Sequence, residues 1–194
     1  MEIILASSSP RRRDLLSILV ENFRVVTPDI DESVNLGELP ACYVERLAIL
    51  KAEHCMKEKT VVIAADTCVS IDNEILGKPV NRDHARAMLR RLSGRKHQVY
   101  TGLAILAPAQ RHAITVKTAV QFSRLDDAVI EGYLDTDEPY DKAGAYGIQG
   151  IAGSFVASIE GSYSSVVGLP LCEAREALQK CGAMTKVVGQ TGER

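Results

Sequence analysis

The chain has 194 residues, of which 46% are hydrophobic and 25% are charged. This length and composition are typical of a globular protein that buries a full core without disulfides. The net charge is −2 at pH 7, so no overall positive field favours a nucleic-acid polymer or an anionic membrane surface. The bulk properties therefore exclude a general nucleic-acid or membrane binder.

The cysteines and the apolar runs of the sequence indicate the cellular compartment of the protein. The five cysteines are an odd number and form no C-x-x-C pair, so a disulfide framework or a zinc site is not expected. The sequence has no apolar stretch long enough to cross a bilayer, and its first residues show no signal-peptide pattern. We therefore expect a cytoplasmic protein with reduced thiols and no membrane partner.

The first half of the chain alternates short apolar runs with helical patterns. Apolar and β-branched runs predict strands at residues 2–6, 23–26 and 60–65, with extended chain from 68 to 71 before a turn at 72–73. Helical spacing and capping residues predict helices that begin at Pro10 after a Ser9 cap, run from Ala41 to about Lys57, and lie between Asn81 and Gly94. The polar residues 29–39 are expected to form a loop.

The second half continues the alternation. Strands are predicted at residues 99–106 and 114–122, and a further one where Phe155, Ala157 and Ile159 alternate. Helices are predicted at 126–134 and 171–180, with a glycine-rich loop at 135–153. Interleaved helices and strands without a linker indicate one α/β domain over residues 1–184, followed by a polar tail, 185–194, that we expect to fray.

The segment Leu5–Arg13 is the most informative local feature. It places three serines, a proline and three arginines where an apolar strand gives way to a helix. Hydroxyls, backbone N–H groups at a helix start and guanidinium groups together bind anions, and a polyphosphate suits them. The alternative is a capped helix start with solvated arginines.

A second feature is Asp66, which follows an apolar run ending in two alanines. A carboxylate left without a partner beside a buried strand costs on the order of several kcal/mol. We expect Asp66 at the carboxyl end of its strand, a place suited to binding a metal ion or accepting a proton from water. The alternative is a cap on the following turn.

Two lysines and a long loop complete the polar features. Lys78 stands between a glycine and a proline, which limits its backbone freedom, and Lys51 lies on a predicted helix; both are candidates for phosphate binding. In the loop 137–150, glycines allow a ligand close to the backbone, and Gln149 offers a donor and an acceptor together. The alternatives are solvated lysines and a plain surface loop. The G-x-x-x-x-G-K-[ST] phosphate loop is absent from the sequence.

Several of these motifs, in this order, resemble the Maf family of nucleotide pyrophosphatases. The matching segments span nearly the whole chain, at 5–12, 31–32, 51–52, 65–67, 77–79, 92–94, 144–150, 161–163 and 166–171. The resemblance implies an elongated mixed sheet flanked by helices, with two lobes around a deep central cleft, like the inosine triphosphate pyrophosphatases (Maf/Ham1). It also implies a homodimer and a divalent metal cation, Mg²⁺, Mn²⁺ or Co²⁺.

Three positions separate the subgroups of this family. The type that acts on uridine and thymidine triphosphates has Arg after the proline, Thr after the aspartate and Gln in the glycine-rich stretch. This chain has Arg11, Thr67 and Gln149 at those positions. The 7-methyl-GTP type has Trp and Gln at the first two. The chain therefore resembles the dTTP/UTP pyrophosphatases, and these three residues are expected to set the base preference.

The resemblance also implies roles at the reacting centre. The expected reaction is attack of water on the α-phosphorus of a nucleoside triphosphate, which releases the monophosphate and pyrophosphate. Asp66 is expected to accept the proton of that water, and Asp66 and Glu32 are the candidate metal ligands. The residues expected to hold the triphosphate are the cations Arg12, Lys51 and Lys78 and the hydroxyls of Ser7 and Ser9.

The function expected first is a house-cleaning nucleoside triphosphate diphosphatase that acts on dTTP, UTP or modified pyrimidine nucleotides and is linked to cell-division arrest. Two alternatives stay open. One is a binding protein that inhibits septum formation, as an older name of the family implies. The other is a pyrophosphatase of the same fold for modified purine triphosphates. Measuring pyrophosphate release from a panel of nucleotides separates all three.

Overall fold

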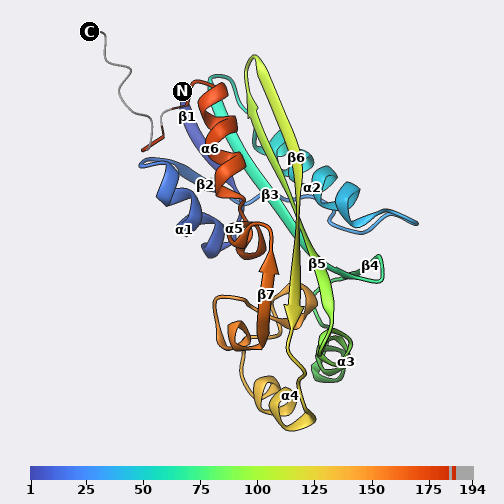
Figure 1. The fold of residues 1–194 in the computed structure, drawn as a ribbon. Coiled ribbons are helices and arrows are strands. Elements are labelled where there is room, and N and C mark those ends of the chain that lie inside the picture. The colour runs from blue at the N-terminus through green and yellow to red at the C-terminus, as the bar shows by residue number, and fades with distance from the viewer. Residues whose placement is uncertain (184, 187–194) are drawn as a thin grey trace.

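The computed structural model describes residues 1–183, 185 and 186, and Figure 1 shows their arrangement. Its strands are β1 (Glu2–Ala6), β2 (Arg24–Val26), β3 (Thr60–Ile71), β4 (Glu74–Leu76), β5 (Lys96–Ala107), β6 (Gln110–Phe122) and β7 (Val156–Glu160). They form one seven-stranded sheet in the order β2-β1-β3-β5-β6-β7, with β4 beside β3. β1 runs parallel to β2 and β3, whereas the other pairs are antiparallel. The predicted α/β class with a mixed sheet is confirmed.

One edge of β3 lacks a strand partner in its middle. On this edge β1 pairs with β3 only as far as Ile63, and β4 pairs with it only from Val69 onward. The opposite edge pairs with β5 without interruption from Val62 to Ser70. Asp66 lies within the interrupted stretch. The expectation that Asp66 ends its strand is therefore wrong, because β5 supplies backbone partners that carry β3 past it.

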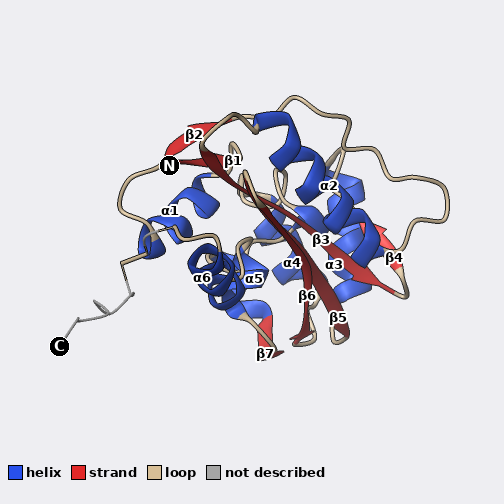
Figure 2. Ribbon diagram, turned by 90° about the horizontal axis from the view of Figure 1, so that it is seen from above, coloured by secondary structure: helices blue, strands red, loops and turns tan. Residues whose placement is uncertain are grey.

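Helices cover both faces of the sheet. Figure 2 shows α1 (Pro10–Leu19) and α6 (Leu171–Lys180) on one side and α2 (Pro40–Cys55) on the other. The approach of α2 is close because β5 carries a glycine beneath it: a Cβ on Gly102 would lie 2.2 Å from the carbonyl oxygen of Val44. The central strands β3 and β5 are thus buried on both faces along most of their length, in agreement with their nearly continuous apolar runs.

Consecutive residues of β3 contribute to different cores. Val61, Ile63 and Ala65 pack into the cluster with α1 and α6, whereas Val62 and Ala64 pack into the cluster with α2. Side chains of a strand alternate between its two faces, so the next two residues, Asp66 and Thr67, also face opposite sides of the sheet. This alternation divides the polar residues of the site between two faces.

A third core lies at the other end of the elongated molecule (Figure 1). It is formed by α3 (Arg82–Leu92), α4 (Asp127–Leu134), the far ends of β5 and β6, and the glycine-rich loop. Asn81 and Asp126 cap the two helices through hydrogen bonds to backbone N–H groups. The sequence placed Asn81 just before its helix, as observed, but counted Asp126 as the first helical residue. The division of residues 1–184 into two lobes around a cleft stays a prediction.

The sequence patterns did not predict two short elements, and they gave a wrong burial pattern for one strand. β4 and α5 (Tyr163–Val167) have 3 and 5 residues, too few for a periodic signal. The expected alternation of Phe155, Ala157 and Ile159 is wrong, because Phe155 lies before the strand and Ala157 is exposed. β7 is the last strand of the sheet, and all of its residues are exposed or half-buried.

The predicted tail begins on the folded part of the chain. Thr185 is buried, and the backbone N–H of Lys186 donates to the carbonyl oxygen of Leu19 at 2.7 Å. The expectation of fraying is therefore wrong for these two residues, since they pack against α1; residues 187–194 lie outside the described residues. Among the described residues, no helix has both the length and the apolar character that a membrane span needs.

Candidate active site

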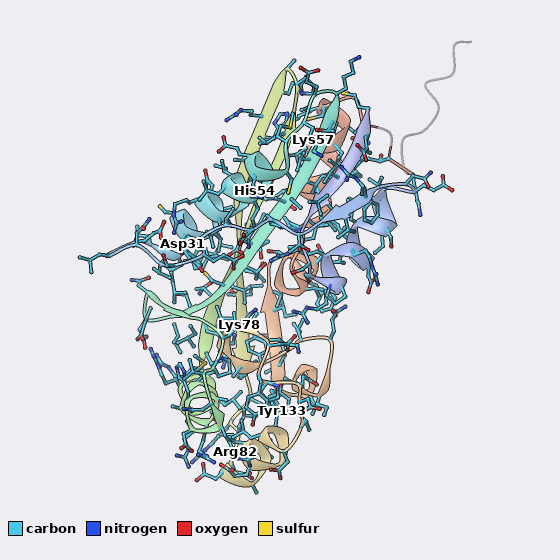
Figure 3. All side chains as sticks on the ribbon, turned by 180° about the vertical axis from the view of Figure 1, so that it is seen from behind. Asp31, His54, Lys57, Lys78, Arg82 and Tyr133 are labelled. Atoms are coloured by element: carbon cyan, nitrogen blue, oxygen red, sulfur yellow. The ribbon has the colours of Figure 1, made fainter. Side chains whose placement is uncertain are left out.

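A pocket of about 880 Å³ opens beside the interrupted edge of β3. Its walls come from the residues after β1 and β2, from α1, α2 and β4, and from the glycine-rich loop before β7. Figure 3 shows Lys78 near the middle of the molecule, between its two ends. All the residues predicted for the site line this pocket: Ser7, Ser9, Arg11, Arg12, Glu32, Lys51, Asp66, Thr67, Lys78 and Gln149.

The two predicted metal-binding carboxylates meet at one ammonium group. Nζ of Lys51 lies 2.6 Å from Oδ1 of Asp66 and 2.8 Å from Oε1 of Glu32. Lys51 and Asp66 are buried, whereas the Glu32 side chain is 55% exposed. A cation between two carboxylates offsets their mutual repulsion, so Lys51 allows both acids to stand in one pocket. An acidic pair and a lysine from three separate segments thus form one contact group.

The loop that carries Glu32 is held down by α2. The Tyr43 hydroxyl donates to the carbonyl oxygen of Glu32 at 3.0 Å, and burial with two nearby carboxylates raises the pKa of Tyr43 to about 12. Arg46 donates to both carboxylate oxygens of Glu38, at 2.6 and 2.7 Å, and to the carbonyl oxygen of Ser33 at 3.0 Å. The Arg46 hydrogen bonds lower the pKa of Glu38 to about 2. The position of Glu32 is therefore fixed by a bond to its own carbonyl and by bonds to the residues that follow it.

On the other face of β3, Arg12 joins three segments. Its Nε donates to the carbonyl oxygen of Gly168 at 2.9 Å, and Nη2 donates to Oγ1 of Thr67 at 3.2 Å. Nη1 lies 3.5 Å from Oγ of Ser7. Burial lowers the pKa of Arg12 from its ordinary value, and the charge of Asp66 acts against this shift. The guanidinium is fixed with its charge beside the pocket.

The helix start contributes through its backbone and its hydroxyls. The N–H of Ser9 donates to Oγ of Ser7 at 3.1 Å, and Oγ of Ser9 accepts the N–H of Arg12 at 3.4 Å. Ser9 is therefore the N-cap that the sequence predicted, and the hydrogen of its hydroxyl remains for a ligand. Arg11 reaches across the pocket toward Asp141, with 3.9 Å between Nη1 and Oδ2.

Lys78 and Gln149 lie on the exposed wall of the pocket. The segments that carry Lys78 and Gln149 are joined by a hydrogen bond of 3.1 Å, which the N–H of Gly144 donates to the carbonyl oxygen of Gly77. Gly144 has a φ of +69°, a backbone conformation that glycine adopts readily. Lys78 and Gln149 therefore line the pocket from segments whose backbones are joined.

Cys68 also lines the pocket and bears on the kind of chemistry. Burial raises the pKa of its thiol to about 12, with the nearby charge of Asp66 adding to the effect. A thiolate, rather than a thiol, is the nucleophile in cysteine catalysis. The neutral thiol of Cys68 is thus unsuited to attack, which leaves the carboxylates and cations as the reactive groups on this wall.

Glu138 is a pocket residue that the sequence analysis did not select. Its Oε2 accepts the N–H of Ile151 at 2.8 Å, and its Oε1 accepts the N–H of Ala152 at 3.2 Å and the Tyr133 hydroxyl at 3.0 Å. A Cβ on Gly150 would lie 2.2 Å from Oε2, so a glycine is required there. Glu138 therefore clamps the segment that follows Gln149. The glycines of this segment indicate that some group packs closely against its backbone, but the sequence does not show that this group is the Glu138 carboxylate.

The acidic residues fit a divalent cation only together with a ligand. Within the described residues, no group of three or more His, Cys, Asp or Glu side chains is placed to hold a metal. Asp66 and Glu32 nevertheless converge on a single cationic atom, Nζ of Lys51. Mg²⁺ is usually held by one or two carboxylates with waters and substrate phosphates. The donor set suits such an ion, with phosphate oxygens completing its coordination.

Fold and pocket together define an α/β protein whose mixed sheet carries a pocket lined by charged side chains, with paired carboxylates on one face of β3 and a fixed arginine on the other. Residues 2–181 match the family model of the Maf-like proteins. The chain therefore belongs to the Maf family.

Curated relatives agree with this assignment. The dTTP/UTP pyrophosphatase of Hahella chejuensis is 50% identical over 185 residues, which cover 93% of this chain and 92% of the relative. The dTTP/UTP pyrophosphatase of Shewanella sp. (strain MR-7) is 48% identical over 192 residues, or 94% and 99% of the two chains. That of Caldanaerobacter subterraneus is 48% identical over 185 residues, or 93% and 89%.

Proposed function

We propose that this protein is a nucleoside triphosphate pyrophosphatase that hydrolyses dTTP and UTP to the monophosphate and pyrophosphate. The observation that carries the proposal is Lys51 between Asp66 and Glu32, in a pocket that also gathers Arg12 and Lys78. Paired carboxylates beside several cations suit a polyphosphate that is to be hydrolysed. The relatives named dTTP/UTP pyrophosphatase support the choice of nucleotide.

The triphosphate is held by cations on both faces of β3. Lys51 approaches it from the α2 face, Arg12 from the opposite face, and Lys78 from the exposed wall. Ser7 and Ser9 donate hydrogen bonds to it from the start of α1. Because the pocket binds a charged group from several directions, it orients the α-phosphorus toward the carboxylates.

Asp66 accepts a proton from the attacking water. Lys51 holds Oδ1 of Asp66, which directs Oδ2 toward the water. The water oxygen forms a bond to the α-phosphorus, the bond from that phosphorus to the bridging oxygen of the β-phosphate breaks, and pyrophosphate leaves. Glu32 and Asp66 would hold a divalent cation, Mg²⁺, Mn²⁺ or Co²⁺. When bound, such a cation offsets the negative charge that develops on the phosphoryl oxygens.

Arg11, Thr67 and Gln149 set the base preference. Arg11, near Asp141 of the glycine-rich loop, Gln149 in that loop and Thr67 on β3 all line the pocket. A uracil or thymine edge presents an N–H between two carbonyl groups. Donors on Arg11 and Gln149 match the carbonyls, and the hydroxyl of Thr67 matches the N–H.

We also propose three wider properties. The fold is of the inosine triphosphate pyrophosphatase type, in which the described pocket forms the floor of a deep cleft. The protein acts in the cytoplasm, and it works as a homodimer. Sedimentation at micromolar concentration tests the dimer, because a single species of monomer mass at all concentrations contradicts it.

The direct test of the activity is product analysis with a panel of nucleotides in Mg²⁺. Purified protein is incubated with UTP, dTTP, CTP, GTP, ITP and 7-methyl-GTP, and monophosphate and pyrophosphate are measured. UTP and dTTP are expected to give the highest kcat/KM, with one pyrophosphate per monophosphate. Release of orthophosphate instead of pyrophosphate, or a preference for a purine nucleotide, contradicts the proposal. No hydrolysis of any nucleotide favours a binding protein.

A further inference from the structure

Thr67, in the candidate site, is tied to a buried residue on the neighbouring strand. Thr67 and Thr101 stand opposite each other in the pairing of β3 with β5, and their Oγ1 atoms are 3.0 Å apart. Thr101 is fully buried, whereas Thr67 is half-buried and lines the pocket. One hydroxyl of the pair can therefore meet a ligand, and the other cannot.

The hydrogen of the Thr101 hydroxyl is already used. Oγ1 of Thr101 donates to the carbonyl oxygen of Ser165 at 2.8 Å. Ser165 lies in the short helix α5, and the last four carbonyls of a helix have no partner along the helix. A hydroxyl carries a single hydrogen. In the 3.0 Å contact, Thr101 must therefore accept and Thr67 must donate.

The oxygen of Thr67 is consequently left as an acceptor only. Its own hydrogen is committed to Thr101, and its second contact, Nη2 of Arg12 at 3.2 Å, is a donor. A ligand atom that approaches this oxygen must bring a hydrogen of its own. A ligand atom with a lone pair meets repulsion and loses its hydrogen bond to water.

We propose that Thr101 is a positioning residue that fixes Thr67 as a hydrogen-bond acceptor, and that the site thereby selects uracil and thymine over cytosine. Uracil and thymine carry an N–H at ring position 3, whereas cytosine has a lone pair there. This inference rests on the proposed function, in which the base of the bound nucleotide reaches Thr67. A site built around one hydrogen bond rejects an analogue that cannot make it, because its polar group is then left unmatched.

The inference is tested by competition between UTP and CTP. The wild-type protein is expected to favour UTP in kcat/KM by roughly tenfold or more. Thr101→Val removes the acceptor that holds the Thr67 hydrogen, so the Thr67 hydroxyl can turn and donate to cytosine. The UTP-to-CTP ratio of this variant is expected to fall toward one. Thr101→Ser keeps the hydroxyl and should keep the wild-type ratio.

Thr118→Val is the matched control. Thr118 is also fully buried, and its hydroxyl donates to a carbonyl just before α5, that of Ser162, at 3.3 Å. Thr118 does not line the pocket, so its loss should lower the thermal midpoint without changing the ratio. If Thr101 had only a packing role, both valine variants would have a lower thermal midpoint and an unchanged UTP-to-CTP ratio.

Two results would overturn the inference. The first is a Thr101→Val protein that is folded by thermal melting and keeps the UTP-to-CTP ratio within about twofold of wild type. The second is a wild-type protein that hydrolyses CTP and UTP with equal kcat/KM. This result refutes the inference even if the Thr101→Val protein does not fold. Failure of wild type to release pyrophosphate from UTP or dTTP refutes the proposed function instead.

Discussion

The ammonium of Lys51, in α2, lies 2.6 Å from the carboxylate of Asp66, in β3. Helix α2 covers the face of the sheet toward which Asp66 points. The same nitrogen contacts Glu32, so the buried lysine joins the two acids on which the proposed chemistry depends. The first two predictions follow from this arrangement.

Asp66→Asn should keep the fold and lose most turnover. The amide has the shape of the carboxylate but accepts no proton from water, so we expect kcat to fall by roughly 10²–10⁴-fold. Steady-state pyrophosphate release from UTP at saturating Mg²⁺ measures the change. Asp29→Asn, on an exposed acid that lies outside the pocket, is the control and should be near wild type. Rates near wild type for Asp66→Asn would remove this residue from the mechanism.

Arg46→Lys should weaken the placement of Glu32. A lysine keeps the charge but cannot hold both oxygens of Glu38 and the carbonyl of Ser33 at once. We expect a several-fold rise in the Mg²⁺ concentration needed for half-maximal activity. Titration of activity with Mg²⁺ measures it. Arg111→Lys, in an exposed pair with Glu53, should leave the titration unchanged. Equal Mg²⁺ curves for both variants would argue against a role of Arg46 in placing Glu32.

Glu138→Gln should loosen the segment that follows Gln149. The amide nitrogen faces a backbone N–H where an oxygen now accepts one, so we expect about 1–3 kcal/mol of lost stability and a higher KM for UTP. Thermal unfolding and steady-state kinetics measure the two effects. Glu160→Gln, on an exposed partner of Lys96, is the control. A destabilised variant with an unchanged KM would show that the clamp does not serve substrate binding.

His97 should make stability depend on pH. It is buried beside Tyr146, with 2.8 Å between Nε2 and the hydroxyl, and burial lowers its pKa from 6.5 to about 4. The unfolded chain therefore binds a proton between pH 6.5 and 4 that the folded protein does not. The free energy of unfolding should fall by about 3 kcal/mol as the pH is lowered through this range, because one pKa unit corresponds to about 1.4 kcal/mol.

Chemical denaturation between pH 7 and 4 tests this dependence. His97→Gln should remove this part of the pH dependence, whereas His54→Gln, on an exposed residue of α2, should retain it (Figure 3). A pH profile of His97→Gln that parallels wild type would assign the effect to other groups.

The sequence alone determined the elements with a strong local signal, and it selected a set of candidate site residues. The Ser9 cap, the boundaries of α6 and the buried strand before Asp66 depend on neighbours close in the chain. The selected serines, cations and carboxylates all line one pocket. They could be selected because each belongs to a short motif whose residue types indicate phosphate or metal chemistry.

Tertiary structure decided which groups fix those residues in place. Asp66 lies within β3 because β5, about 35 residues away in the chain, carries the pairing past it. Thr101, Glu138 and Ser165 give no signal of their own in the sequence, yet they set the direction of one hydroxyl and hold one loop. Such roles follow from contacts between segments distant in the chain, and local patterns carry no information about which distant segments will meet.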